Sequence, residues 1–367
     1  MVRKGSRVQF PWAAPLPHLS SCPFSPCILP GMARAWFFSL FLSILFPIGV
    51  YAQTKVSSPS FSDVPQSREE FEAVENLKRR GIIEGRPNGT FGSDDFVNRA
   101  EAVTIVVRAV ANVRNLPSSK KCFPDVQGDL WFVRTVCYAK DLDWVAGYPD
   151  KTFQPVRTVA KGEFLKILLN AYGVDTDAVV RQWKEGLASD AQDPSQWYFP
   201  YLAYAVASSM THADDAGNLN PGAALRRGQV ALLVHRFLLH REGERTQALL
   251  TESEKDIRQA FAKLDALDIL PAQFATARVR LMAWGALERL PDSGVVRATA
   301  KLGDALAALV HAYSLVQQSQ MESALAASGY AYALADEADR LSGDVRVYSD
   351  RIRSAAHTLA EAVRGHQ

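Results

Sequence analysis

The chain has 367 residues and is 48% hydrophobic, so it is long enough for about two or three folded domains and is not composed like a disordered protein. Its formal net charge is +2, but residues 1–52 contain four basic and no acidic residues, which leaves about −2 (2 − 4) for the rest. The nearly neutral charge of residues 53–367 argues against nucleic-acid binding, which requires a strongly basic surface.

The N-terminus has the pattern of a secretory leader. Arg34 precedes an apolar run over residues 36–50, and the small residue Ala52 follows it, which matches the charge, length and cleavage site of a signal peptide. The run is shorter than the roughly 20 apolar residues of a membrane span. We therefore expect a leader over 1–52, followed by a polar linker over 53–60.

Two features of the leader leave alternatives open. Residues 1–31 are Pro-rich and contain Cys22 and Cys27, which is unusual before an apolar run and makes Met32 a candidate for the true start. An uncleaved anchor is the alternative to a cleaved signal. Cysteine does not closely follow the run, so a lipoprotein signal is not indicated.

Three similar segments come next, and we call them repeats 1, 2 and 3 (61–114, 123–173 and 188–240). Each begins with an acidic loop and a short helix, makes a turn, and opens a second helix with a basic residue. The step from the start of the turn to that basic residue is 14 in every repeat: Gly85 to Arg99, Gly147 to Lys161 and Ala213 to Arg227. Such a constant step indicates repeated units that pack together.

Apolar residues in each repeat follow a helical period. In repeat 1 they are Phe71, Val74 and Leu77, and then Val103, Val106, Val107 and Val110. One helix–loop–helix unit is too small to bury both of its stripes, so we expect three units to share one core. The fold class predicted is therefore mainly all-α.

Cys122 and Cys137 are the two cysteines that follow the leader. An even pair in an exported protein indicates a disulfide, which would close a loop of about 15 residues and contribute roughly 3 kcal/mol. The alternative is two free buried thiols. A metal site is disfavoured because two cysteines do not fill a tetrahedral shell.

Residues 245–367 are rich in Ala, Leu, Glu and Arg, with breaks at Pro271, 291–294, Ser319 and 342–343. The breaks predict about five helices in an antiparallel bundle. The last helix carries a narrow apolar seam at Val345, Tyr348, Ile352, Ala355, Leu359 and Val363. Self-association through an exposed seam is the alternative.

Sequence motifs for catalysis are weak. The chain has no His-Glu-x-x-His, no Gly-x-Ser-x-Gly and no phosphate-binding loop. His235 and His240 lie near the end of a helix beside arginines, and we expect surface positions for them rather than metal ligation. The sequence therefore predicts no catalytic residue, cofactor or metal.

Repeats 1 and 2 carry specific motifs. They are Phe-x-Asp-Val at 61–64 and 123–126, Gly-x-Pro-(Asn/Asp)-x-Thr-Phe at 85–91 and 147–153, and Val-Asn-Arg-Ala-Glu at 97–101. With these motifs the chain resembles S-layer homology repeats over about 180 residues. The resemblance implies a three-pronged, pseudo-threefold helical domain around a central bundle.

The resemblance also implies a function, namely non-covalent attachment to cell-wall polysaccharide, often a pyruvylated polymer or a peptidoglycan-linked glycan. The family places a basic residue, an aromatic residue and the turn glycine in a groove between prongs. A guanidinium can bind a carboxylate bidentately, and a flat ring can cover a sugar face. The matching positions are Arg99, Lys161 and Arg227, then Trp131 and Trp197, and finally Gly85 and Gly147.

No repeat matches the family pattern completely. Glu69 occupies the tryptophan position of repeat 1, Lys161 replaces arginine in repeat 2, and Ala213 replaces the turn glycine in repeat 3.

Structural roles compete with the implied ones. Arg99 could pair with a loop carboxylate such as Asp63, and the tryptophans could be wedges between prongs. We interpret Asp63, Asp125 and Asp190 as loop or helix caps rather than ligands.

The sequence thus favours an exported, wall-associated, non-enzymatic protein that uses its repeats as an anchor. One rival is a surface-layer protein that assembles through its C-terminal helices. The other is a wall-anchored enzyme or processing factor with its site in 245–367. The sequence does not specify the glycan, the working groove, the envelope type or the partner of the bundle.

Overall fold

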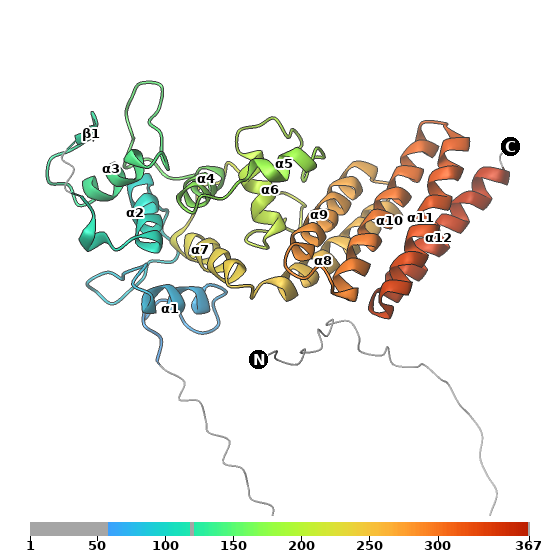
Figure 1. The fold of residues 1–367 in the computed structure, drawn as a ribbon, viewed down its shortest axis with the longest axis horizontal. Helices are drawn as coiled ribbons and strands as arrows, with labels where there is room; N and C mark the ends of the chain where they lie inside the picture. The colour runs from blue at the N-terminus through green and yellow to red at the C-terminus, as the bar shows by residue number, and fades with distance from the viewer. Residues whose placement is uncertain (1–57, 118–120, 366–367) are drawn as a thin grey trace, which may run out of the picture. The chain divides into compact units, whose positions relative to one another are not determined.

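A computed structural model describes residues 58–117 and 121–365 of the chain, so the expected leader lies outside the described residues. Residues 59–367 belong to one compact unit. The all-α prediction is confirmed, because the regular secondary structure of the described residues is helical apart from one short hairpin (Figure 1). None of the helices in the described ranges combines the length and apolar character that crossing a bilayer requires.

The repeats contain α1 (Phe71–Arg79), α2 (Arg99–Val110), α3 (Val133–Asp141), α4 (Lys161–Ala171), α5 (Asp177–Gln182), α6 (Phe199–Ala207) and α7 (Arg227–Arg241). The C-terminal region contains α8 (Thr246–Asp265), α9 (Ile269–Leu287), α10 (Gly294–Gln317), α11 (Met321–Leu341) and α12 (Arg346–Gly365). Two 3-10 turns, η1 (Val113–Asn115) and η2 (Gly343–Val345), and the antiparallel strands β1 (Lys121–Phe123) and β2 (Val126–Gln127) complete the structure. The sequence did not predict the hairpin or α5.

The second helix of each repeat starts at a backbone cap. In repeat 1 the Asn98 side chain accepts the backbone N–H of Glu101 at 2.9 Å, and the Glu101 carboxylate accepts the N–H of Asn98 at 2.9 Å. Glu163 and Gln229 accept the corresponding backbone N–H groups in repeats 2 and 3. These caps fix the position of the basic residue at the helix start.

The three loop aspartates hold the turns of their own repeats. Asp63 accepts the backbone N–H groups of Phe91 and Gly92, each at 2.7 Å. Asp125 and Asp190 make the same pair of bonds in repeats 2 and 3. Their interpretation as loop caps is confirmed.

The repeats close into a pseudo-threefold ring. Val97 accepts from the N–H of Val159, Val159 from that of Leu225, and Leu225 from that of Val97, at 3.0, 3.0 and 2.9 Å. The helices follow the same cyclic order, because α3 packs on α2, α6 on α4 and α1 on α7. The expected threefold arrangement is confirmed, and its units exchange partners: the first helix of each repeat packs on the second helix of the preceding one.

A disulfide joins Cys122 to Cys137, as predicted, and ties β1 to α3. The Cα atoms are 5.3 Å apart and the sequence separation is 15 residues. The alternative of two free thiols is wrong.

The C-terminal region forms the five expected helices, and α10, α11 and α12 lie side by side (Figure 1). One predicted break is misplaced. The chain turns at 266–268, and Pro271 lies in the first turn of α9, where a missing N–H removes no helical bond.

The apolar seam of α12 faces the interior of the bundle. Tyr348, Ile352, Leu359 and Val363 are all buried. This seam is therefore covered by α10 and α11, and it offers no exposed stripe for self-association.

His240 is buried at the end of α7, so the expectation of a surface position is wrong. Its ring meets the edge of Tyr204, and its Nε2 atom lies 3.4 Å from the guanidinium of Arg289. Burial, together with the positive charges of Arg289 and Arg245, lowers the pKa of His240 to about 4.

Stability should therefore fall as the pH falls. The unfolded His240 binds a proton near pH 6.5 but the folded one only near pH 4, so this group should remove about 2 kcal/mol of unfolding free energy between pH 7.5 and pH 5. Urea unfolding at both pH values should show a smaller pH effect in His240→Gln than in the wild type. Equal pH effects in the two proteins would contradict this prediction.

Candidate functional site

One groove, which we call groove A, combines residues of all three repeats. Gly85 and the preceding turn of repeat 1 form one wall, and α2 forms another. Arg227 of repeat 3 lies at its base, and Trp131 of repeat 2 stands at its edge. The cavity has a volume of about 230 Å³.

The second groove, groove B, has the same plan moved by one repeat. Gly147 and Tyr148 come from repeat 2, together with Glu163 and Lys166 of α4. Arg99 comes from repeat 1 and Trp197 from repeat 3, and the cavity measures about 160 Å³. Each groove thus joins a turn glycine to the basic residue of the preceding repeat and the tryptophan of the following one.

The third equivalent location, position C, is built differently. Lys161, Ala213 and Glu69 stand where the other positions have arginine, glycine and tryptophan. Glu69 forms an ion pair with Arg236 of α7 at 2.7 Å, and Arg236 also donates to the carbonyl of Met210. Position C therefore lacks a tryptophan, and the carboxylate of Glu69 and the guanidinium of Arg236 satisfy each other.

The basic residues link neighbouring repeats through backbone carbonyls. Arg99 donates from Nε to the carbonyl of Phe153 at 3.0 Å and from Nη2 to that of Ala146 at 2.9 Å. Arg227 donates in the same way to the carbonyls of Phe91 and Glu84. The alternative in which Arg99 pairs with a carboxylate of its own repeat is wrong.

Lys161 makes one such bond, from Nζ to the carbonyl of Leu219 at 2.8 Å, because an ammonium lacks the guanidinium fork. Burial lowers the pKa of Arg99, Arg227 and Lys161, as it disfavours a charged group. An arginine stays protonated at neutral pH nevertheless, so grooves A and B each keep a fixed positive charge.

The two tryptophans are exposed. Trp131 is 62% exposed and Trp197 53%, whereas tryptophan is on average highly buried. A wedge between prongs would be buried, so that interpretation is wrong for both rings. An exposed ring at the edge of a groove is available to cover an apolar ligand face.

The turn glycines are required by packing inside their own repeats. A Cβ atom at Gly85 would lie 2.2 Å from the Phe61 ring, and one at Gly147 would lie 2.9 Å from the Phe123 ring. In repeat 3 the position of this phenylalanine is occupied by Ala188, whose smaller side chain leaves room for the Cβ atom of Ala213. Both of these alanines are buried.

Sequence reasoning missed several groove residues. Arg108 and Glu84 line groove A, while Trp144, Tyr148 and Lys166 line groove B. The signal that could have found Arg108 and Lys166 is their helical spacing, since they follow the capping glutamates Glu101 and Glu163 on the same helices.

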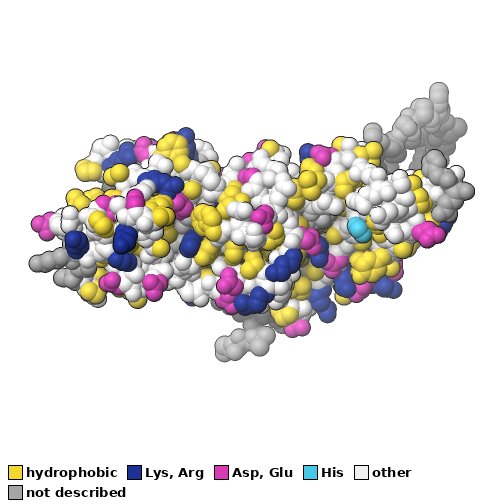
Figure 2. All heavy atoms as spheres, turned by 90° about the horizontal axis from the view of Figure 1, so that it is seen from above, with side chains coloured by type: hydrophobic (Ala, Val, Ile, Leu, Met, Phe, Trp, Pro, Cys, Tyr) yellow, Lys and Arg dark blue, Asp and Glu magenta, His cyan; other side chains and the backbone are white. Residues whose placement is uncertain are grey.

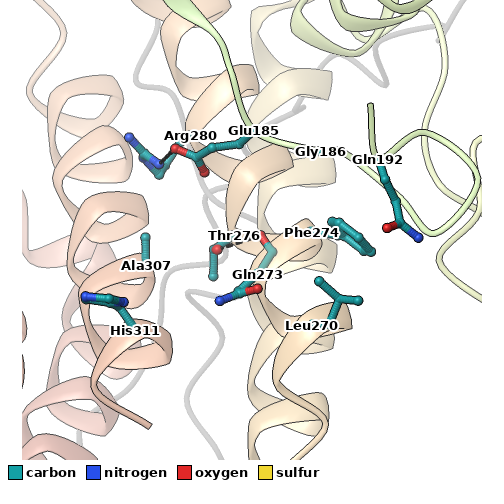
Figure 3. Close-up of a pocket in the computed structure, with 10 residues that line it drawn as sticks. All are labelled: Glu185, Gly186, Gln192, Leu270, Gln273, Phe274, Thr276, Arg280, Ala307 and His311. Atoms are coloured by element: carbon teal, nitrogen blue, oxygen red, sulfur yellow. Dashed lines mark hydrogen bonds and ion pairs between the residues drawn. The ribbon is translucent and has the colours of Figure 1, made fainter. Parts of the chain in front are cut away.

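A larger cavity of about 520 Å³ lies between the loop before repeat 3 and helices α9 and α10 (Figure 3). Arg280 points to Glu185, at 2.6 Å, and also pairs with Asp304 at 3.0 Å, so its charge is compensated. Two hydrogen bonds join residues that line this cavity. Arg280 donates to the carboxylate of Glu185, and the Thr276 hydroxyl donates to the carbonyl of Gln273. Neither bond pairs a nucleophile with a general base.

Charges of both signs are interspersed over the face seen in Figure 2, in keeping with the nearly neutral composition of the body. In the part of the chain that the structure describes, no group of three or more His, Cys, Asp or Glu residues is arranged to hold a metal ion. The features that set grooves A and B apart from the rest of the described surface are therefore their exposed tryptophan rings and their fixed arginines.

Comparison with known proteins identifies the repeats. Residues 60–103 and 123–165 match the family model of the S-layer homology domain, so the N-terminal half contains S-layer homology repeats. These segments are the cores of repeats 1 and 2.

Three relatives share this region. The chain is 28% identical to the surface-layer 125 kDa protein of Lysinibacillus sphaericus over 170 residues, 46% of this chain and 14% of the relative. It is 31% identical to the middle cell wall protein of Brevibacillus brevis over 122 residues, which are 33% of this chain and 12% of the relative. It is 23% identical to the cellulosome-anchoring protein of Acetivibrio thermocellus over 186 residues, which are 50% of this chain and 40% of the relative. The chain therefore spans less than half the length of these relatives.

Proposed function

With S-layer homology repeats in its N-terminal half, we propose that this chain is an exported, non-enzymatic protein that attaches to cell-wall polysaccharide through grooves A and B. The observation that carries the proposal is that an arginine held by backbone carbonyls, a close-packed turn and an exposed tryptophan come together twice from three different repeats. The C-terminal helices then present the protein outward or contact a partner.

The chemistry of the grooves suits a sugar. A ring that covers a sugar face removes about 60 Å² of apolar surface from water, which contributes roughly 1.5 kcal/mol. A guanidinium at the base supplies hydrogen bonds to sugar or carboxylate oxygens, and these are stronger than neutral ones. The guanidinium is fixed before binding, since the helix cap and the carbonyl bonds already hold it.

The proposal is tested by pull-down with purified cell-wall sacculi. We expect each of Trp131→Ala and Trp197→Ala to weaken binding about tenfold, and the double variant to weaken it further, since each removes about 1.4 kcal/mol of stacking. Tyr330→Ala is the matched control, because Tyr330 is 62% exposed on α11, outside the repeats.

Two results would count against the proposal. Failure of the wild-type protein to bind sacculi would remove the anchoring function. Full binding by the double tryptophan variant would place the site elsewhere on the protein.

The alternative hypothesis, a surface-layer protein that self-assembles, makes a different prediction. It requires the full chain to form large particles, which light scattering would detect. The buried seam of α12 argues against assembly through that stripe. A monomer at all concentrations would exclude this rival.

A further inference from the structure

The exposed rings of grooves A and B stand at the start of two short helices. Trp131 lies two residues before the first residue of α3, and Trp197 lies two residues before that of α6. Both helices have nine residues. An isolated helix needs roughly 12 to 15 residues to be even marginally stable in water. The position of each ring therefore depends on what holds its helix to the rest of the protein.

In groove A this helix is held by a covalent bond. The disulfide links Cys137, the fifth residue of α3, to Cys122 of β1. Lys140, also on α3, donates a hydrogen bond to the carbonyl of Cys122. The fifth residue of α6 is Ala203, so α6 has no such bond and must be held in another way.

The C-terminal helix α9 contacts the end of α6. Charged residues occur in α1 and α3, but α6 contains none. Its last residue is Ala207, whereas α1 and α3 end in Arg79 and Asp141, which are exposed. A Cβ atom at Gly285 of α9 would lie 1.9 Å from the carbonyl oxygen of Ala207. The close packing of α6 on α9 therefore requires glycine at this position.

The turn that follows α6 is held by the start of α8. Ser209 in this turn is buried, and Arg245 donates from Nη2 to its carbonyl and to its hydroxyl, each at 2.5 Å. Arg245 also pairs with Glu252 of α8 at 3.5 Å. The equivalent turn residues after α1 and α3, Gly81 and Asp143, are both exposed. The C-terminal helices thus hold α6 at its last residue and at the turn beyond it.

We propose that the C-terminal helices position the ring of groove B through α6, as the disulfide positions the ring of groove A through α3. Gly285 and Arg245 are then positioning residues for Trp197, although neither lines groove B. This inference rests on the proposed function. It gives the C-terminal helices a part in glycan binding that requires no contact with the glycan.

The test measures binding of the full chain to sacculi in two backgrounds. Trp131→Ala leaves only the ring of groove B, and Trp197→Ala leaves only that of groove A. We expect Gly285→Ala to weaken binding about tenfold in the Trp131→Ala background and less than about twofold in the Trp197→Ala background. Reduction of the disulfide should give the reverse pattern.

Gly329→Ala is the matched control. Gly329 also lies inside a C-terminal helix, α11, but a Cβ atom there would have no neighbour within 4 Å. This substitution should change binding less than about twofold in both backgrounds.

Hydrogen exchange gives a readout that needs no ligand. In Gly285→Ala the backbone amides of α6 should exchange about tenfold faster, while those of α3 should keep their rates. Arg245→Gln keeps the glycine and removes the bonds to Ser209, so it should act in the same direction and serves if Gly285→Ala does not fold.

The outcomes separate this inference from the anchoring function. Equal weakening by Gly285→Ala in both backgrounds would show a general loss of stability and would overturn the inference. Faster exchange in α6 with full affinity in both backgrounds would overturn it as well, because the ring would then keep its position without the C-terminal helices. If the wild type does not bind sacculi, the proposed function fails, and the exchange rates still decide whether the C-terminal helices hold α6.

Discussion

Replacing Arg278 with alanine is expected to lower the free energy of unfolding by about 3–5 kcal/mol. Arg278 is 1% exposed and holds the carboxylate of Asp256 with bonds of 2.5 to 3.1 Å. It also donates to the carbonyl of Leu187 at 2.7 Å, and so joins α8 and α9 to the loop before repeat 3. Truncation leaves a buried carboxylate and a buried carbonyl without their donor.

The sign of the pH effect follows from Asp256. Burial already raises the pKa of its carboxyl group, and loss of the guanidinium would raise it further. A carboxyl whose folded pKa is raised contributes least at high pH, so the loss in Arg278→Ala should be larger at pH 7 than at pH 4. Urea unfolding at the two pH values measures it.

A double variant distinguishes a broken pair from lost packing. Arg278→Met together with Asp256→Leu removes both charges and keeps apolar volume, so it should recover much of the stability that Arg278→Ala loses. A loss below about 1 kcal/mol in Arg278→Ala would contradict the assigned role. A double variant that is no more stable than Arg278→Ala would show that the bond to Leu187 matters more than the pair.

Removing the Cys122–Cys137 disulfide is expected to cost about 3 kcal/mol, as estimated for a closed loop of this size. The closed loop contains β2 and Trp131, so the tryptophan of groove A should lose its position before the tryptophan of groove B does. Thermal unfolding with and without a reductant measures the effect.

A matched variant controls for other actions of the reductant. Cys122→Ala with Cys137→Ala should unfold at the temperature of the reduced wild type and should not respond to reductant. Equal unfolding temperatures for the oxidised and reduced wild type would refute this stabilising role.

Much of the fold could be predicted because equivalent residues are separated by the same number of positions in each repeat. The constant step to Arg99, Lys161 and Arg227 predicted three equal helix starts, and the caps show why they are equal. The order of packing could not be predicted. The apolar stripe of α1 is equally suited to α2 and α7, and only the closed ring of backbone bonds selects α7.

The individual residues of the grooves could be predicted from the sequence, but the sequence does not show which residues of different repeats share a groove. A motif within one repeat gives no information on which repeat it contacts, so the sequence leaves a pair of Arg99 with Asp63 open, whereas Arg99 donates to the carbonyl of Phe153 in repeat 2. The motifs alone do not show that the turn glycines pack against Phe61 and Phe123, and this packing explains why Ala213 occurs in the repeat that has Ala188 in place of the phenylalanine. Likewise, the sequence around His240 gave no sign that its helix end is covered by Tyr204 and Arg289.

The cyclic order of the repeats also sets the smallest unit that can form the grooves. Groove A takes its arginine from repeat 3, and groove B takes its tryptophan from the same repeat. Deleting repeat 3 would therefore remove a lining residue from both grooves. Neither groove can form from one repeat or from two, because each takes lining residues from all three.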